Sequence, residues 1–327
     1  MNTVKNLLPA RLPFLALAAV VLAFLLPFMI SSQMESLLTR ALIFAVMAAS
    51  LDLAYGQAGL ISLGHAALAG VGGYTAGLLM VQGGIDSFWI GMLAAGAAAA
   101  VASLIFALIS LRTKGLYFIL VTLALGQGMA NLAQQWDVLK TGGAEAVVGI
   151  MWPSLGFGEE WNPGTFYQFV LVVCVVAMWI ILRIGGSPLG LAMRGTRDND
   201  ERMQALGYNT YRYRVAALVV SGTLTGMAGA LFAYHSGLIA PSNIGLETSG
   251  LLVLMVIIGG TGTRYGPALG GIFVVLLEFY ATEVSQARAP LLIGLLFIVT
   301  ALTFHRRAAL AAWVRRVTRR SPQHGLT

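Results

Sequence analysis

The chain has 327 residues, of which 58% are hydrophobic and only 10% are charged. A soluble domain carries about 25% charged residues, so a soluble fold would lack the polar surface needed to cover this much apolar side chain. The net charge of +7 does not indicate nucleic-acid binding, because the basic residues stand in short clusters between long apolar runs. Composition therefore predicts an integral membrane protein. Its single cysteine, Cys174, forms no internal disulfide.

The first apolar run, residues 12–30, follows Lys5 and Arg11. Secretory signal peptides have the same order of a basic segment followed by an apolar one. The run has the length of a membrane span, and no clear A-x-A cleavage site follows it. We therefore expect an uncleaved first membrane helix, with a cleaved signal peptide as the alternative.

Ten apolar segments are candidates for membrane spans, which need roughly 20 residues each. They are residues 12–30, 41–55, 60–81, 88–111, 115–134, 163–184, 215–236, 249–260, 268–282 and 290–304. Three of them, 41–55, 249–260 and 268–282, are too short to cross the membrane unaided.

The positive-inside rule tests this count, because cytoplasmic loops are enriched in Lys and Arg. With the N-terminus inside and the spans alternating, 17 of the 20 basic residues fall inside, and only Arg40, Lys140 and Arg288 fall outside. We therefore predict an all-α, polytopic transmembrane bundle of about ten spans, with short Gly-interrupted helices and with both the N- and C-termini cytoplasmic. Eight spans with two re-entrant pairs preserve the same parity. The basic tail, residues 305–327, is expected to lie on anionic lipid or against a partner.

The first segment that suggests a function runs from Tyr55 to His65 and joins two short apolar runs. Irregular backbone at membrane depth survives only against protein or along a water-filled path, and short glycine-interrupted segments point to transport sites. The alternative is close packing of helices through small residues. The predicted translocation-path residues of this segment are Gly56, Gln57, Gly59, Ser62, Gly64 and His65.

A second glycine segment, residues 258–267, occupies a similar place in the second half of the chain. It also joins two short apolar runs, and the predicted topology turns both segments inward. This correspondence hints at an internal repeat. The candidate path residues here are Gly259, Gly260 and Gly262.

The predicted inside loop, residues 185–214, carries the densest charge in the chain. Asp198 or Asn199 is a suitable N-cap and Gly207 a suitable stop, so a short cytoplasmic helix is expected between them. Its mixed charge and its Met–Ala–Leu stripe favour a docking element over an ordinary solvated loop.

Three ionisable residues, Asp52, His65 and Glu278, lie within or beside spans, where burial is costly and often serves function. For His65 a helix-packing hydrogen bond is favoured over contact with a solute, and for the two acids the alternative is pairing across helices or a polar crevice near a span end. The sequence has no metal-ligand cluster, catalytic triad, dinucleotide fingerprint or G-x-x-x-x-G-K-[ST] phosphate loop. We therefore expect no metal, no cofactor and no enzymatic activity in the chain itself.

Three motifs keep a fixed order along residues 40–280. The run G-L-I-S-L-G-H-A-A-L at 59–68 is followed by R-D-N-D at 197–200 with A-L-G-Y-N at 205–209, and then by L-M-V-I-I-G-G-T-G at 254–262 with Y-G-P at 265–267. In these motifs the chain resembles the permeases of branched-chain amino-acid ABC importers, the LivM/LivH type, and LivM more than LivH.

The resemblance implies a transmembrane permease domain over residues 1–304, with about ten helices, in a bacterial inner membrane. It implies a sister permease, two cytoplasmic ATP-binding subunits and an extracytoplasmic substrate-binding protein as partners, and no nucleic acid. It also makes the inside loop an ATPase-coupling element. The implied coupling residues are Arg194, Arg197, Asp198, Asp200, Glu201, Ala205, Leu206 and Gly207.

The resemblance leaves the solute open. Branched-chain or other small amino acids are the leading expectation, but related permeases carry urea, amides, aromatic acids or nucleosides. The family's Ala-Ala-Glu is replaced here by Arg202, Met203 and Gln204, so we expect coupling contacts that differ in detail from the family's. A stand-alone transporter that uses Asp52 or Glu278 as a proton site is the alternative from another class, although it needs no docking helix.

Overall fold

The computed structural model describes residues 22–28, 30–136, 146–156 and 161–284, together with Leu291, Gly294, Leu295 and Ile298. Most of the predicted span 12–30, nearly all of the span 290–304, the tail 305–327 and both termini lie outside the described residues. The chain divides into a first unit that ends at Val275 and a second that begins at Leu276.

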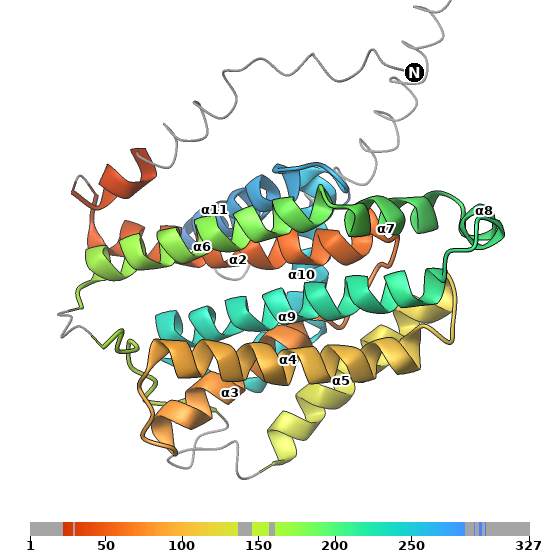
Figure 1. The fold of residues 1–327 in the computed structure, drawn as a ribbon. Helices are drawn as coiled ribbons and strands as arrows, with labels where there is room; N and C mark the ends of the chain where they lie inside the picture. The colour runs from red at the N-terminus through yellow and green to blue at the C-terminus, as the bar shows by residue number, and fades with distance from the viewer. Residues whose placement is uncertain are drawn as a thin grey trace, which may run out of the picture. The chain divides into compact units, whose positions relative to one another are not determined.

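The described backbone is mostly helical, as the sequence predicts (Figure 1). The elements in chain order are η1 (Leu26–Phe28), α2 (Ser32–Asp52), η2 (Leu53–Gln57), α3 (His65–Val81), α4 (Phe88–Ser110), α5 (Leu116–Gln135), β1 (Val147–Val148), α6 (Pro163–Gly185), α7 (Pro188–Asp198), α8 (Asp200–Ala205), α9 (Thr210–Ser236), β2 (Leu238–Ile239), η4 (Pro241–Ile244), α10 (Leu246–Gly259) and α11 (Gly266–Val284). The two strands form a small antiparallel ribbon in which Val147 lies opposite Ile239.

Six helices of the described part are long and apolar enough to cross a membrane. They are Ser32–Gln57, Phe88–Ser110, Leu116–Gln135, Pro163–Gly185, Thr210–Ser236 and Gly266–Glu283. The apolar helices α3 and α10 are shorter, at 17 and 14 residues. At 1.5 Å per residue α10 extends about 21 Å, less than the roughly 30 Å hydrocarbon core. The count of about ten spans stays a prediction.

One helix is longer than the sequence predicts. The apolar run 41–55 is too short to cross, but α2 and η2 together form a continuous helix of 26 residues. The additional N-terminal turns contain Glu35 and Arg40. Because these residues are charged, the hydropathy of the turns is too low to predict a membrane span there. Glu35 is buried, and the Arg40 guanidinium lies 5.6 Å from the centre of the Phe44 ring. Contacts within the bundle therefore accommodate charges that the sequence alone counts against a span.

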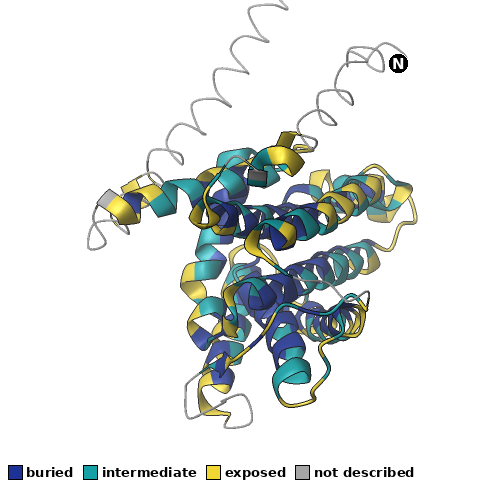
Figure 2. Cartoon of the chain, turned by 90° about the vertical axis from the view of Figure 1, so that its left-hand side faces the viewer, coloured by how far each residue is buried: buried dark blue, intermediate teal, exposed yellow. Residues whose placement is uncertain are grey.

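The core forms around α9, which packs against α3, α4 and α2. A Cβ atom added at Gly72 of α3 would lie 1.9 Å from the carbonyl oxygen of Gly226 in α9, so the two backbones touch there. Such close approach through small residues is typical of membrane helices. Buried residues line the inward faces of the helices, and exposed residues gather on the outward faces (Figure 2). In the most apolar window of each helix, 83% of α2–η2 is buried but only 28% of α5.

Loops of the first unit gather at two ends. At one end, the turns 58–61, 111–115 and 262–264 lie beside α7, because their residues line two cavities with it. We call this the charged end. At the opposite end β1 pairs with β2, and the amide of Phe88 donates to the carbonyl of Ser154 over 2.9 Å. This division of the loops is the one that the predicted alternation of spans requires.

Candidate functional site

The candidate site begins where α2 ends. After Asp52 the helix widens into η2, a single π-helical turn, and the chain then turns away at Gly59 with φ of +73°. π-Helical turns are rare and are found frequently at functional sites. Gly56 and Gln57, two of the predicted path residues, lie within this turn.

Two arginines of α7 bind this turn. Arg194 Nη1 donates to Gln57 Oε1 over 2.5 Å and to the carbonyl of Gly185 over 2.7 Å. Arg197 Nη1 donates to the carbonyl of Gly56. Hydrogen bonds from a charged donor are roughly twice as strong as neutral ones. Hydrogen bonds from two arginines therefore hold helix α7 against η2.

The second glycine segment reaches the same point. Asp52 Oδ1 accepts a hydrogen bond from the amide of Gly262 over 2.8 Å, and the Asp52 side chain is buried. A Cβ atom at Gly56 would lie 2.1 Å from Asp52 Oδ1 and 2.4 Å from the Gly262 nitrogen, so only glycine fits at position 56. Gly262 itself has φ of +73°. The two glycine segments, far apart in sequence, thus meet backbone to backbone.

These contacts form one connected set, which we call the polar junction. Its members are Asp52, Gly56, Gln57, Arg194, Arg197 and Gly262. Asp52 is the last residue of α2. The other members come from η2, α7 and the turn between α10 and α11, the three segments that the sequence singles out separately. A cavity of about 190 Å³ adjoins the junction and is lined by Thr263 and Arg264 as well as by junction residues.

Gly59 packs against the junction, since a Cβ atom there would lie 3.0 Å from Arg197 Cγ. The other three predicted path residues of the first segment lie elsewhere. His65 is completely buried, and its Nε2 lies 2.7 Å from Ser221 Oγ in α9. Ser221 Oγ donates its one hydrogen to the carbonyl of Ser50 over 2.6 Å, so His65 Nε2 is the donor of the first bond. His65 therefore makes a helix-packing hydrogen bond, the role that the sequence favours over contact with a solute.

The loop between η2 and α3 packs against α4 and α5. Ser62 is buried, and its hydroxyl accepts a hydrogen bond from the amide of Gly64 over 3.3 Å. A Cβ atom at Gly64 would lie 2.7 Å from both Phe106 and the carbonyl of Thr122. Gly259 and Gly260 end α10, where Gly259 contacts the backbone of Gly266. Of the nine predicted path residues, the structure brings Gly56, Gln57 and Gly262 together.

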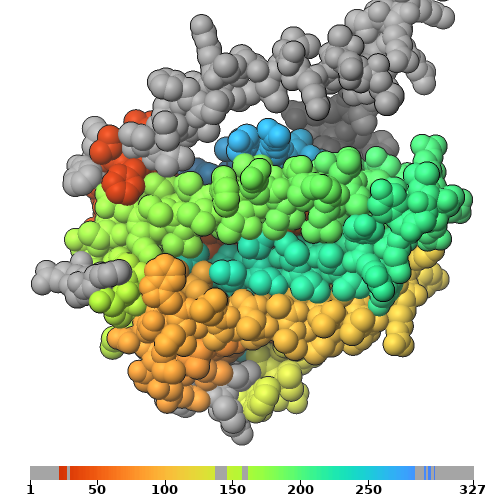
Figure 3. Space-filling view, viewed as in Figure 1, coloured from red at the N-terminus to blue at the C-terminus, as the bar shows by residue number. Residues whose placement is uncertain are grey.

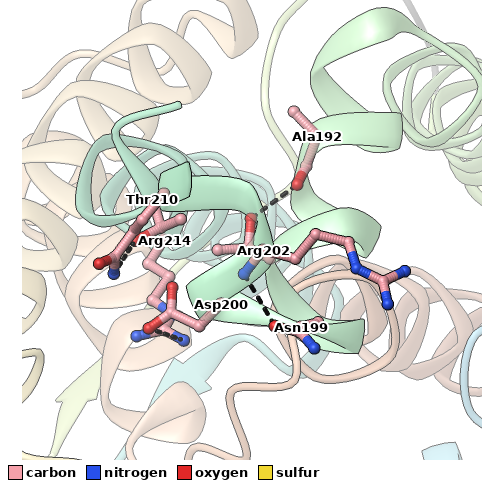
Figure 4. A network of polar contacts seen from close by, with 8 residues as sticks. Ala192, Asn199, Asp200, Arg202, Thr210 and Arg214 are labelled. Atoms are coloured by element: carbon pink, nitrogen blue, oxygen red, sulfur yellow. Dashed lines mark hydrogen bonds and ion pairs between the residues drawn. The ribbon is translucent and has the colours of Figure 1, made fainter. Parts of the chain in front are cut away.

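The predicted cytoplasmic helix is α8, and its capping follows the sequence. Asn199 Oδ1 accepts from the amide of Arg202 over 2.8 Å at the start, and Gly207 takes φ of +85° after the end. Asp200 pairs with Arg214 of α9 at 3.3 Å (Figure 4). Thus α8 is attached to α9 by an ion pair and joined to α7 through the residue that caps it.

The eight predicted coupling residues divide into two groups. Arg194 and Arg197 belong to the polar junction, and Asp200 forms the ion pair with α9. The other five have no part in these contacts and are exposed, and none of the residues of α8 is buried. Those exposed residues are Asp198, Glu201, Ala205, Leu206 and Gly207. Leu206 leaves 66% of its surface open, and the segment lies at the right-hand edge of the space-filling view (Figure 3).

Two features of the site escape prediction from sequence. The carbonyl of Gly185, which Arg194 binds, is a backbone group with no signature of its own. Ser50 and Thr225, whose hydroxyls lie 2.7 Å apart in the core, are ordinary small polar residues in apolar runs. Asp52 does carry a signal, as an isolated acid at a span end. Among the described residues no group of three or more His, Cys, Asp or Glu side chains is placed to hold a metal ion.

Comparison with known proteins identifies the family. The family described as "Branched-chain amino acid transport system / permease component" matches residues 33–301. The chain belongs to this family. The permease is 27% identical to LivM, a high-affinity branched-chain amino acid transport system permease protein of Escherichia coli, over 86% of this chain and 71% of that protein. No solved structure matches the permease.

Two further relatives carry the same description. The permease is 25% identical to BraD of Pseudomonas aeruginosa and 24% identical to LivH of Escherichia coli, in each case over 82% of this chain and 92% of the relative. Membership makes the permease a multi-pass transmembrane subunit of an ABC transport family, and such subunits are not themselves catalytic.

Proposed function

We propose that the permease is the membrane subunit of an ATP-driven importer, forms the translocation path and transmits the movement of cytoplasmic ATPases to it. The polar junction is the observation that carries this proposal. It connects α7, which bears the exposed helix α8, to both glycine segments at once. An element that is exposed on one side and fastened to irregular membrane backbone on the other is suited to transmit force.

The transmission follows from the contacts. A Cβ atom at Gly195 of α7 would lie 2.7 Å from the Met203 sulfur of α8, so the two helices pack together, and the Asp200–Arg214 pair adds the start of α9. When a partner displaces α8, α7 moves with it and draws Arg194 and Arg197 away from η2. Each hydrogen bond to a charged group contributes about 1.5–3 kcal/mol, which sets the scale of the energy that the partner must supply.

The proposal includes an orientation and a set of partners. The charged end faces the cytoplasm of a bacterial cell, in agreement with the positive-inside rule. Two ATP-binding subunits complete the transporter on that side, and one of them docks on α8. The opposite end, where β1 pairs with β2, receives the extracytoplasmic substrate-binding protein. A sister permease completes the membrane part, since alternating access needs two halves that move against each other.

The proposed solute is a branched-chain or other small amino acid. The names of LivM, BraD and LivH support this class. Urea, amides, aromatic acids and nucleosides are the alternative solutes of related permeases. Calorimetric titration of the cognate soluble receptor with one member of each class tests the proposal, which requires the amino acids to bind most tightly.

The coupling role is tested at Gly207, which ends α8. Its φ of +85° is closed to proline, and its amide donates to the carbonyl of Gln204 over 2.9 Å. We expect Gly207→Pro to abolish solute-stimulated ATP hydrolysis by the reconstituted transporter, because the end of α8 unravels, while membrane insertion stays intact.

The control is Gly207→Asn at the same position. Asparagine tolerates the left-handed conformation and keeps the amide, so this variant should retain most of the stimulated activity. Normal stimulation in Gly207→Pro, with the chain inserted at the usual level, contradicts the coupling role.

A further inference from the structure

A second cavity lies at the charged end, apart from the polar junction's own cavity. It has a volume of about 220 Å³ and opens between the turn 111–115, the loop 58–61 and the C-terminal end of α7. Its floor is apolar: Leu60 and Phe118 belong to one buried cluster, against which Leu111 packs. Its walls are polar and basic.

Three cations line this cavity, namely Lys114, Arg197 and Arg214. The ion pair of Arg214 with Asp200 offsets one positive charge. Among the described residues that line the cavity none is acidic, so these side chains make its field positive. An anion placed there gains direct Coulomb attraction and screens the three cations from one another.

The start of α5 adds to this field. The cavity reaches Gly115, the N-cap of α5, which has φ of +60° and empty space where a Cβ would stand. The first turn of α5 contains no acidic side chain, so its free amide groups and the positive end of the helix dipole have no acidic partner within that turn. Helix starts of this kind attract phosphate groups.

The surroundings of the cavity indicate where the anion comes from. Helix α5 is largely unburied, and Leu116, Tyr117 and Leu120 are exposed on it next to the cavity. A soluble anion would bind the cations but would make no favourable contact with this apolar surface or with the apolar floor. A phospholipid would make both contacts, with its phosphate among the cations and its acyl chains along α5.

We propose that this cavity binds the phosphate headgroup of an anionic phospholipid from the leaflet at the charged end. This site is additional to the translocation path and the ATPase contact, and only its assignment to the cytoplasmic leaflet rests on the proposed orientation. Arg197 belongs both to the cavity and to the polar junction. A bound phosphate and the Gly56 carbonyl therefore share one guanidinium, which has five N–H donors, so the lipid site and the polar junction are linked through a single side chain.

Native mass spectrometry of the full chain, purified with whatever subunits it retains, measures this binding. Phosphatidylglycerol and phosphatidylcholine are titrated separately, and the wild type should retain the anionic lipid in preference. Lys114→Gln should lower the affinity for phosphatidylglycerol roughly fivefold, which is the usual contribution of one lysine to binding at an anionic lipid surface. Lys114→Arg should restore it.

The matched control is Arg112→Gln, because Arg112 is an exposed cation of the same turn that does not line the cavity. It should leave binding unchanged. Equal retention of the two lipids, or equal losses in Lys114→Gln and Arg112→Gln, overturns the site. Displacement of phosphatidylglycerol by excess inorganic phosphate overturns the assignment to a lipid. The same spectra record ATPase subunits separately, so lipid binding without them would contradict the proposed function alone.

Discussion

Asp52 accepts its hydrogen bond from the Gly262 amide across 210 positions of sequence. An isolated acid at a span end has two interpretations, a proton site or a structural acceptor, and they differ in what the side chain must do. A proton site needs a carboxyl group that titrates. A structural acceptor needs only an oxygen at the position of Oδ1, aimed at the amide of Gly262.

Asparagine separates the two roles, because it keeps the oxygen and cannot titrate. We expect Asp52→Asn to retain solute uptake within about twofold, whereas Asp52→Ala leaves the Gly262 amide without its acceptor at a cost of about 1–3 kcal/mol. Uptake into proteoliposomes and thermal unfolding of the purified chain measure the two effects. Loss of uptake in Asp52→Asn at unchanged stability would favour the proton-coupled alternative.

Individual residues differ in how far sequence predicts them. Asn199 and Gly207 are local signals, since capping depends on neighbours within a few positions, and α8 has the expected cap and stop. The partners of Asp52 and His65 are not local. Nothing in the sequence near His65 marks Ser221, which lies 156 positions away, because a serine in an apolar helix has the same signature whether it binds a neighbour or its own backbone.

At the scale of elements, the packing of α3 on α9 rests on glycine. A methyl group at Gly72 would lie 1.9 Å from a backbone oxygen of α9, so Gly72→Ala forces the two helices apart. We expect a loss of about 1–3 kcal/mol in the free energy of unfolding, the usual cost of overpacking, and a lower melting temperature of the detergent-solubilised chain.

Gly128 in α5 is the matched control, because a Cβ atom there meets nothing within 4 Å. Gly128→Ala should leave the melting temperature unchanged or raise it slightly, since alanine is the better helix former. Equal effects of the two substitutions would contradict the close contact of α3 and α9.

Elements also show why the first glycine segment was difficult to interpret. The sequence of residues 55–65 is compatible with two interpretations, a translocation path and close packing of helices. The structure assigns some residues of the segment to each. Gly56 and Gln57 enter the polar junction, whereas His65 packs against α9. Their sequence neighbourhood is the same, and only the positions of α7, α9 and the second glycine segment distinguish them. The hydropathy pattern likewise does not predict the first turns of α2, because the charge of Glu35 lowers their hydropathy. The structure nevertheless buries Glu35 inside the bundle.

At the scale of the whole molecule, the described loops of the first unit fall at two ends, with the turns 58–61, 111–115 and 262–264 at one end and the β1–β2 ribbon at the other. The charged end contains α7, α8, both glycine turns and the basic cavity. The proposed contacts with the ATPase and with lipid are therefore both at this end, whereas the solute is received at the other. The central claim is that this end serves partners. A permease that works alone has no use for an exposed helix fastened to its irregular membrane backbone.

Affinity purification of the tagged full-length chain from its native membrane, in mild detergent and with quantification of each subunit, tests that claim most directly. The account predicts two ATP-binding polypeptides and one further permease for each tagged chain, with fewer ATP-binding polypeptides retained in Leu206→Ala. Leu191→Ala, a change at an equally exposed leucine of α7, should keep them. A tagged chain that purifies without ATP-binding subunits, yet takes up solute into proteoliposomes under a proton gradient, would contradict the account.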